Sequence, residues 1–359
     1  MWPDRRLVDL FGVTHPIIQA PMAGSVDATM AVAVCEAGGL GSLPCATLNG
    51  DQMRAGIGII QQQTTQPFNA NFFCHDPAKP DAAQDAQWRA RLDPYYKEFG
   101  LGDDTPVPTV DLPPFGEDAC AIIEDLKPAV VSFHFGLPEQ SLLDRVRAVG
   151  CKIVCSANTV REARWLEERG CHAIIAQGSE AGGHRGMFLS EDITEQAGTM
   201  ALVPQVVDAV QVPVIAAGGI ADGRGIAAAF ALGASGVQIG TACLSTPESL
   251  VSDLHRDALS GAEDDQTVIT NAWTGRPARG FRTQLVNDVG AITDAPPDFP
   301  TASGALRPLK NKAESEGSAA FSSLLAGQAA GLNRVAGAGA LVSMLVSEAA
   351  EQFERLSRS

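Results

Sequence analysis

Several motifs that would place a protein in a metal-dependent or exported class are missing from this sequence. It has no Cys-x-x-Cys pair, no Cys/His zinc spacing and no His-Glu-x-x-His motif, so no metal site is expected. Its eight cysteines lie mostly in or beside apolar runs, as buried free thiols of a reducing compartment do. No apolar run is long enough to span a bilayer, and the N-terminus has no signal-peptide core. We therefore expect a cytoplasmic protein.

Positive charge and tyrosine are also scarce. The chain has 26 Lys and Arg against 42 Asp and Glu, which gives a formal net charge of −16. Nucleic acid and anionic lipid both need a basic surface, so neither is an expected partner. An anionic ligand would have to be held by groups close to it. Tyr95 and Tyr96 are the only two tyrosines.

The remaining pattern is a repeated alternation of strand and helix. Hydrophobic residues make up 45% and charged residues 19% of the 359 residues, which is typical of a globular protein with a large core. Short apolar runs that read as strands, each followed by a helical pattern, occupy 15–22, 40–46, 68–73, 129–135, 152–156, 173–176, 213–217 and 236–239. No G-x-G-x-x-G follows the first of them, so an open doubly wound sheet is disfavoured. Eight units predict an α/β fold of the (β/α)8 TIM-barrel type.

Two regions interrupt this alternation. Residues 77–117 contain a charged helical stretch at 81–99 and a proline-rich stretch at 103–114, which we interpret as an insertion without a second core. After Thr241 the spacing changes and proline becomes frequent. We expect a barrel at 1–244, a lid or substrate domain at 245–317 over the barrel mouth, and C-terminal helices at 318–359 that pack back on the barrel.

The stretch AIIAQGSEAGGHRG at 173–186 organises the predicted site. Its apolar half is a buried strand, which delivers His184 to a glycine-rich loop. Gly178, Gly182 and Gly183 allow backbone N–H groups to approach a flat or anionic ligand closely. A surface turn with a solvated histidine is the alternative interpretation.

The ends of the predicted strands add further groups, because the carboxyl ends of barrel strands converge on one mouth. Met22, Asn71, His134, Gln177 and Gln238 all follow or end such strands. The loops GGIADGRG at 218–225 and IGTA at 239–242 match the recurring phosphate site of barrels, where glycine N–H groups and a helix N-terminus hold an anion. Tight turns without a ligand are the alternative.

The other histidines are less informative. His172 starts a strand, on the face of a barrel that serves stability, and is interpreted as structural. His75 follows a strand end and is expected to be solvated. His134 alternates with Phe133 and Phe135 and points away from both, so it contacts either the core or a substrate.

The chain resembles nitronate monooxygenases of class I, formerly called 2-nitropropane dioxygenases, which are FMN-dependent TIM barrels. The matching segments are PIIQAPMAG (16–24), AGGLGS (37–42), PFNANFFCH (67–75), VVSFHFGLP (130–138), AQGSEAGGHRG (176–186) and PVIAAGGIADGRGIAAAFALGASGVQIGT (213–241). The resemblance implies His184 as the catalytic base and His134 beside the substrate. It also implies that FMN is held by Met22, Ala23, Asn71, Gln177, Gly182, Gly183, Gly218, Gly219, Gln238, Ile239, Gly240 and Thr241.

The implied activity is oxidation of alkyl nitronates, such as propionate 3-nitronate, by molecular oxygen. A neutral His184 would take a proton from a nitroalkane, and a protonated His184 would hold an anionic nitronate. The lid stretch at 298–312 lacks the tyrosines that family members often carry, so the physiological substrate stays open, as does the oligomeric state. The alternatives are an NAD(P)H-dependent FMN enoyl or quinone reductase and a flavin-binding protein without turnover.

Overall fold

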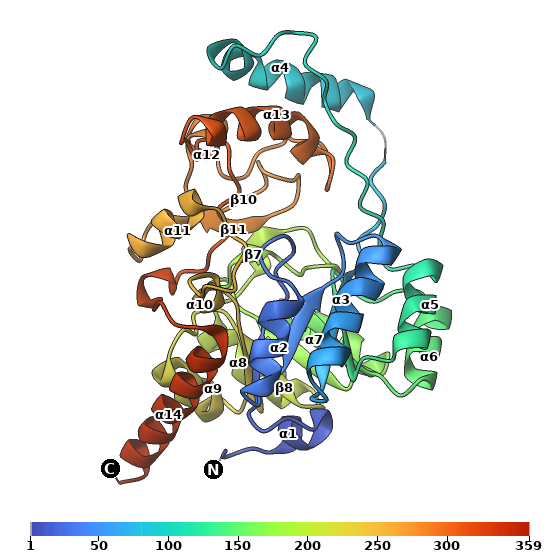
Figure 1. Ribbon diagram of the computed structural model, residues 1–359, viewed down its shortest axis with the longest axis vertical. Coiled ribbons are helices and arrows are strands. Elements are labelled where there is room, and N and C mark those ends of the chain that lie inside the picture. Colours follow the sequence, from blue (N-terminus) through green and yellow to red (C-terminus); the bar gives the residue numbers. More distant parts are fainter. Residues whose placement is uncertain (1, 80, 359) are drawn as a thin grey trace.

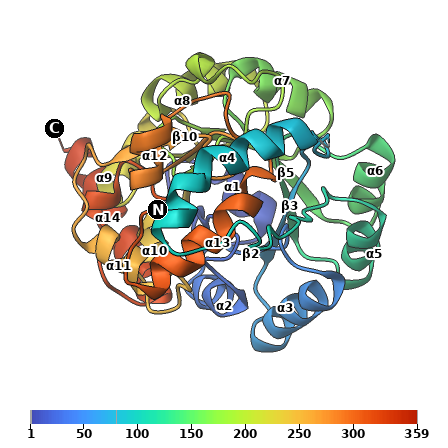
Figure 2. The ribbon, with the colours of Figure 1, turned by 90° about the horizontal axis from the view of Figure 1, so that it is seen from above.

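The computed structural model describes residues 2–79 and 81–358, and its centre is a barrel of eight parallel strands (Figures 1 and 2). The strands are β1 (Ile17–Gln19), β2 (Gly41–Pro44), β3 (Phe68–Phe73), β4 (Val130–His134), β5 (Lys152–Ala157), β6 (Ala173–Gln177), β8 (Val214–Ala217) and β9 (Gly236–Ile239). They pair in chain order, and β9 pairs with β1. A parallel bridge between Ile18 and Leu40 brings β1 beside the start of β2, so the barrel is nearly closed. The TIM-barrel fold predicted from the sequence is confirmed.

Helices cover the outside of the barrel in the order in which the chain forms them (Figure 2). They are α2 (Ala28–Glu36), α3 (Gly50–Gln63), α5 (Glu117–Leu126), α6 (Gln140–Ala148), α7 (Val160–Glu168), α8 (Thr199–Ala209) and α9 (Gly223–Ala231). Asp27, Asn49, Thr159 and Asp222 each accept a backbone N–H at the start of a helix, which sets where α2, α3, α7 and α9 begin.

The barrel has a filled interior and a closed lower end. Helix α1 (Arg6–Phe11) lies across the end at which the strands begin, where Leu7 and Phe11 pack with the inward-facing Ile18, Val154 and Ile215. A larger apolar cluster fills the space between the strands and the surrounding helices. Packing at this end leaves the opposite end, where the strands finish, for a site.

A lid lies over that opposite end (Figure 1). It contains α11 (Asp253–Ser260), the antiparallel strands β10 (Thr267–Thr270) and β11 (Ala278–Phe281), α12 (Gln284–Val289) and α13 (Ala302–Ser315). Its sheet has a third strand, β7 (Gly183–His184), which belongs to the loop that follows barrel strand β6. The glycine-rich loop is therefore part of both units.

The expectation that the insertion forms no second core is wrong. Its helix α4 (Ala82–Glu98) packs on α13 above the barrel (Figures 1 and 2). Trp88, Leu92 and Tyr96 are spaced four residues apart on one helix face and are buried in a second apolar cluster with Leu306 and Leu309. The limits expected for the lid and for the C-terminal segment stay predictions.

The last part of the chain returns to the barrel. The short α10 (Thr241–Leu244) follows β9, and two 3-10 turns lie at Ile193–Glu195 and Ala330–Leu332. Helix α14 (Ala338–Ser357) packs against α9 and α2 (Figure 1). Among the described residues, no helix combines the length and apolar character needed to cross a membrane.

Candidate active site

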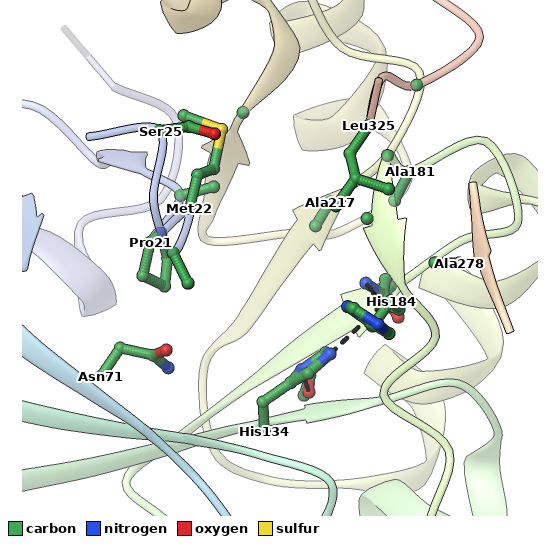
Figure 3. A pocket seen from close by; sticks show the side chains of 18 of the residues that line it. Pro21, Met22, Ser25, Asn71, His134, Ala181, His184, Ala217, Ala278 and Leu325 are labelled. Carbon is green, nitrogen blue, oxygen red and sulfur yellow. Dashed lines mark hydrogen bonds between the residues drawn. The ribbon is translucent and has the colours of Figure 1, made fainter. Parts of the chain in front are cut away.

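The barrel mouth and the lid enclose a cavity of about 550 Å³, within the size range of ligand sites in proteins. Thirteen of the fourteen residues predicted for the site line it: Met22, Ala23, Asn71, His134, Gln177, Gly182, Gly183, His184, Gly218, Gly219, Gln238, Gly240 and Thr241. Ile239 does not, because alternation along β9 turns its side chain into the core under the helices. Figure 3 shows Pro21 and Met22 on one side of the cavity and Ala181, Ala217 and His184 on the other.

One wall of the cavity requires glycine for steric reasons. Gly218 and Gly219 have φ values of 112° and 71°, which side chains rarely adopt. A Cβ atom on Gly182 would lie 2.6 Å from the backbone nitrogen of Gly327, so these two loops touch backbone to backbone. This wall offers backbone groups to a ligand with no side chain between.

The start of α9 has fewer free donors for an anion than the sequence suggested. Its first N–H groups are already used: Asp222 accepts from Arg224 and Gly225 at 2.9 and 3.2 Å, and Glu348 accepts from Gly223 at 3.0 Å. Donors for an anion would then come from the backbone at 182, 218–219 and 240–241. The Thr241 hydroxyl also lines the cavity, where it accepts a bond from the Gly327 N–H at 2.9 Å and keeps its own proton for another acceptor.

Buried positive charge lies directly against the glycine-rich loop. Arg185 is 1% exposed and donates to the backbone carbonyls of residues 178, 179, 181, 182 and 183. Arg279 of the lid donates to the carbonyl of Ser179 at 2.8 Å. Neither guanidinium forms an ion pair with a described carboxylate, and burial lowers the pKa of both. The Glu180 carboxylate of the same loop acts on the pKa of both guanidinium groups in the opposite direction. Two cations beside one carboxylate still leave net positive charge, which favours an anion at this loop although the whole chain is acidic.

His184 faces the cavity from β7, on the loop that the two arginines hold (Figure 3). Its Nε2 lies 2.9 Å from the hydroxyl of Thr274, a lid residue. Burial lowers the pKa of His184 to about 3, and the nearby His134 and Arg276 act in the same direction. The imidazole is therefore neutral at physiological pH, as a proton acceptor must be.

His134 lines the same cavity, but both of its ring nitrogens are occupied. Nδ1 accepts from the Ser156 hydroxyl at 2.6 Å, and Nε2 lies 3.2 Å from the carbonyl oxygen of His184 (Figure 3). Gln177 donates to that carbonyl as well, at 3.1 Å, and accepts from the Gly186 N–H at 2.8 Å. These bonds position the His184 loop, whereas the contact of His134 with substrate stays a prediction.

The amide groups of Asn71 and Gln238 are more open. The Nδ2 atom of Asn71 donates to the Ser132 hydroxyl at 3.0 Å, while Oδ1 has no hydrogen bond to a described residue. Gln238 lines the cavity with no side-chain hydrogen bond inside the described parts of the chain. These two side chains can therefore bind a polar ligand without breaking an existing bond.

One interpretation made from the sequence needs correction. His75 is buried, not solvated: its Nε2 lies 3.0 Å from the Leu112 carbonyl, and its ring packs edge-on against Phe135 and Phe299. Glu162 is a further buried polar residue close to the site. It is 1% exposed and accepts from the N–H groups of Asn158 and Phe188 at 2.7 and 2.8 Å, so it anchors the chain that follows His184.

Sequence reasoning missed the residues that the lid and the insertion bring to the cavity. They include Val110, Asp111, Leu112, Trp273, Thr274, Phe299, Ser303 and Arg307. The only signal was WTGRPARG at 273–280, where polar groups and a glycine follow a strand-like run. Nothing in the irregular stretch around Val110 marks it, because its place depends on contact with Gly304 of α13.

Comparison with known proteins agrees with this geometry. The model of the family described as nitronate monooxygenase matches residues 4–348. The chain belongs to the nitronate monooxygenase family. A nitronate monooxygenase of Paraburkholderia phytofirmans is 40% identical over 355 residues, which cover 98% of this chain and 97% of that one. The family resemblance inferred from the sequence is thus confirmed, and with it the prediction of an enzyme.

Two solved structures are similar to this protein along almost its full length. The structure of a nitroalkane oxidase from Streptomyces ansochromogenes has a TM-score of 0.87 at 36% identity and covers 98% of this chain and 99% of its own. FabK from Thermotoga maritima has a TM-score of 0.73 at 28% identity, with 99% of both chains covered. Lid and insertion are therefore shared features of these proteins, not additions peculiar to this chain.

Proposed function

We propose that this protein is an FMN-dependent oxidoreductase that oxidises alkyl nitronates, such as propionate 3-nitronate, with molecular oxygen. The observation that carries the proposal is the pairing of two groups in one cavity. A glycine wall backed by Arg185 and Arg279 suits a phosphate, and a neutral His184 faces the same space. Family membership supports the reaction class.

The residues present fit FMN. The phosphate would lie against the backbone at Gly182, Gly218–Gly219 and Gly240–Thr241, where added Cβ atoms would fill the space or strain the chain. Asn71 and Gln238 would bind polar edges of the ring system, with Met22 and Ala23 beside it. When bound, FMN supplies the electron acceptor for the oxidation and passes electrons to oxygen.

The role proposed for His184 is that of a base. Removal of a proton from the carbon next to a nitro group leaves the electron pair on the nitro group, and the proton goes to the imidazole. The lowered pKa of His184 argues against a permanently protonated anchor for an anion and leaves the imidazole neutral, as a base must be before it takes a proton. A nitronate that binds beside it would raise that pKa by its charge.

An absorbance spectrum and an oxygen-electrode trace test this proposal. The purified protein should carry FMN, identified after release by its mass, and should consume oxygen when propionate 3-nitronate is added under air. Oxidation of NADH with an enoyl or quinone acceptor, without oxygen uptake from nitronate, would support the rival reductase. Bound flavin with neither activity would support a flavin-binding protein without turnover.

A further inference from the structure

The lid supplies a hydrogen bond to the base of the barrel site. Thr274 lies in the turn between β10 and β11, and its Oγ1 is 2.9 Å from Nε2 of His184. The two segments are held together by strand pairing, with Ala278 opposite His184 and the Arg185 N–H donating to the Pro277 carbonyl at 2.9 Å. The ring and the hydroxyl are therefore fixed relative to each other.

The hydrogen-bonding capacity of Thr274 favours one tautomer of His184 over the other. A threonine hydroxyl has one proton to donate and two lone pairs to accept with. The Arg276 carbonyl oxygen lies 3.3 Å from Oγ1, and the Arg276 N–H points at Oγ1 from 3.4 Å. If the hydroxyl donates to the carbonyl, it can accept from Arg276 and from Nε2–H, and all three bonds form together. If it donates to Nε2, the bond to the carbonyl is lost.

The other nitrogen of the ring is free for chemistry. Nδ1 of His184 has no hydrogen bond to any described residue. It is not fully enclosed by protein atoms, so it is open to the cavity. Other polar side chains near the ring are committed elsewhere: His134 to Ser156 and to the backbone, and Arg276 to the Met187 carbonyl, with its guanidinium over the Phe135 ring. Among the described residues, Thr274 is the one side chain bonded to this ring.

We propose that Thr274 is a positioning residue that holds His184 in the tautomer with the proton on Nε2, so that Nδ1 is the atom that accepts the proton of a nitroalkane. This inference rests on the proposed function and extends it to the lid. The rings of Phe135 and Phe299, with centroids 6.0 and 5.3 Å from that of His184, limit other orientations of the imidazole. Loss of the hydroxyl leaves the ring in place but removes its preference for one tautomer.

The test compares Thr274→Val with Thr274→Ser, since valine keeps the shape and serine keeps the hydroxyl. We expect Thr274→Val to lower kcat/KM for a neutral nitroalkane about 10- to 100-fold, the loss seen when the residue that orients a metal-bound histidine is removed. The loss for the preformed nitronate should be much smaller, because that substrate needs no base. Thr274→Ser should restore most of the activity. Thr283→Val is the matched control, since its buried hydroxyl has no hydrogen-bond partner within 2–79 and 81–358 and lies outside the cavity.

Nitrogen NMR of the full chain with labelled histidine gives a readout that does not depend on activity. The His184 signals, assigned by their absence in a His184→Gln sample, should show a protonated Nε2 and a bare Nδ1 in the wild type. They should show mixed tautomers in Thr274→Val. Equal losses on nitroalkane and nitronate, or an unchanged tautomer in Thr274→Val, would overturn the inference. A wild-type protein inactive on nitronate would instead contradict the proposed function, and the NMR result would still decide the tautomer.

Discussion

Three neighbouring polar residues of the glycine-rich loop have three different tasks. Glu180 accepts from the backbone and side chain of Thr199 at the start of α8. Arg185 turns back and binds the carbonyls of its own loop. His184 lines the cavity with one ring nitrogen free of hydrogen bonds to the described residues. The sequence shows that all three belong to one loop, but the direction of each side chain depends on what surrounds that loop.

Replacement of His184 by alanine tests the proposed base at this scale. We expect the variant to keep its flavin and to lose about 10²- to 10⁴-fold in kcat/KM for neutral nitroalkanes, the usual contribution of a positioned base. Flavin absorbance and oxygen uptake measure the two effects. His172→Ala is the control, because that ring accepts a backbone bond from Ile153 and does not line the cavity. Loss of flavin from His184→Ala would mean that the histidine supports the cofactor site instead.

Gly182→Ala tests the glycine wall. Its new Cβ would lie 2.6 Å from the nitrogen of Gly327 and 2.7 Å from the carbonyl carbon of Ala326, so one loop must move. Overpacking of this kind costs roughly 1–3 kcal/mol, which predicts about 10- to 100-fold weaker flavin binding. Titration of the apoprotein with FMN, followed by fluorescence, measures it. Gly58→Ala in α3, where a Cβ meets nothing within 4 Å, should bind FMN as the wild type does.

At the scale of elements, the lid is joined to the barrel at the site itself. Strand β7 carries His184 and pairs with β11. The segment 325–330 lines the cavity and donates backbone hydrogen bonds to Glu180 and Thr241. Helix α4 from the insertion then packs on α13. Changes in the distant lid core should therefore reach the cavity through β11 and α13.

Trp88→Ala is the corresponding prediction. The Trp88 ring is 1% exposed, and its Nε1 donates to the Ala302 carbonyl at 3.1 Å, at the start of α13. Its loss should destabilise the lid by about 3–5 kcal/mol, while the barrel keeps its own core. Hydrogen exchange should rise in α4 and α13 and stay low in β4–β6, and the exposed neighbour Gln87→Ala should change neither. Uniformly faster exchange would contradict a separately packed lid.

The whole molecule combines an acidic charge of −16 with histidines that are kept neutral inside it. Burial lowers the pKa of both His134 and His184 to about 3, against about 6.5 in an unfolded chain. Between these values the unfolded chain binds more protons than the folded one. The free energy of unfolding is therefore unaffected by these groups above about pH 6.5 and falls as the pH drops below it.

Thermal unfolding at several pH values tests this. The midpoint temperature should fall as the pH is lowered from 6.5 to 5, a window above the usual pKa range of Asp and Glu. The corresponding loss of unfolding free energy is at most about 2 kcal/mol for each buried histidine. His184→Gln cannot titrate and should reduce this slope. The same slope in wild type and variant would show that His184 is protonated in the folded protein at pH 5.

The order of apolar runs was enough to predict the barrel and thirteen cavity-lining positions, including His184 of the glycine-rich loop. The reason is that the parallel strands of a closed barrel all end at the same mouth. The four-residue spacing of Trp88, Leu92 and Tyr96 also indicates a buried helix face in the lid, although the many charged residues of α4 make this pattern hard to recognise. Only the tertiary structure decided the rest. It determined that Arg185 binds backbone and not solvent, that both ring nitrogens of His134 are occupied, and which nitrogen of His184 is bonded by Thr274. These outcomes depend on contacts between residues up to 90 positions apart. Local sequence patterns do not encode such contacts.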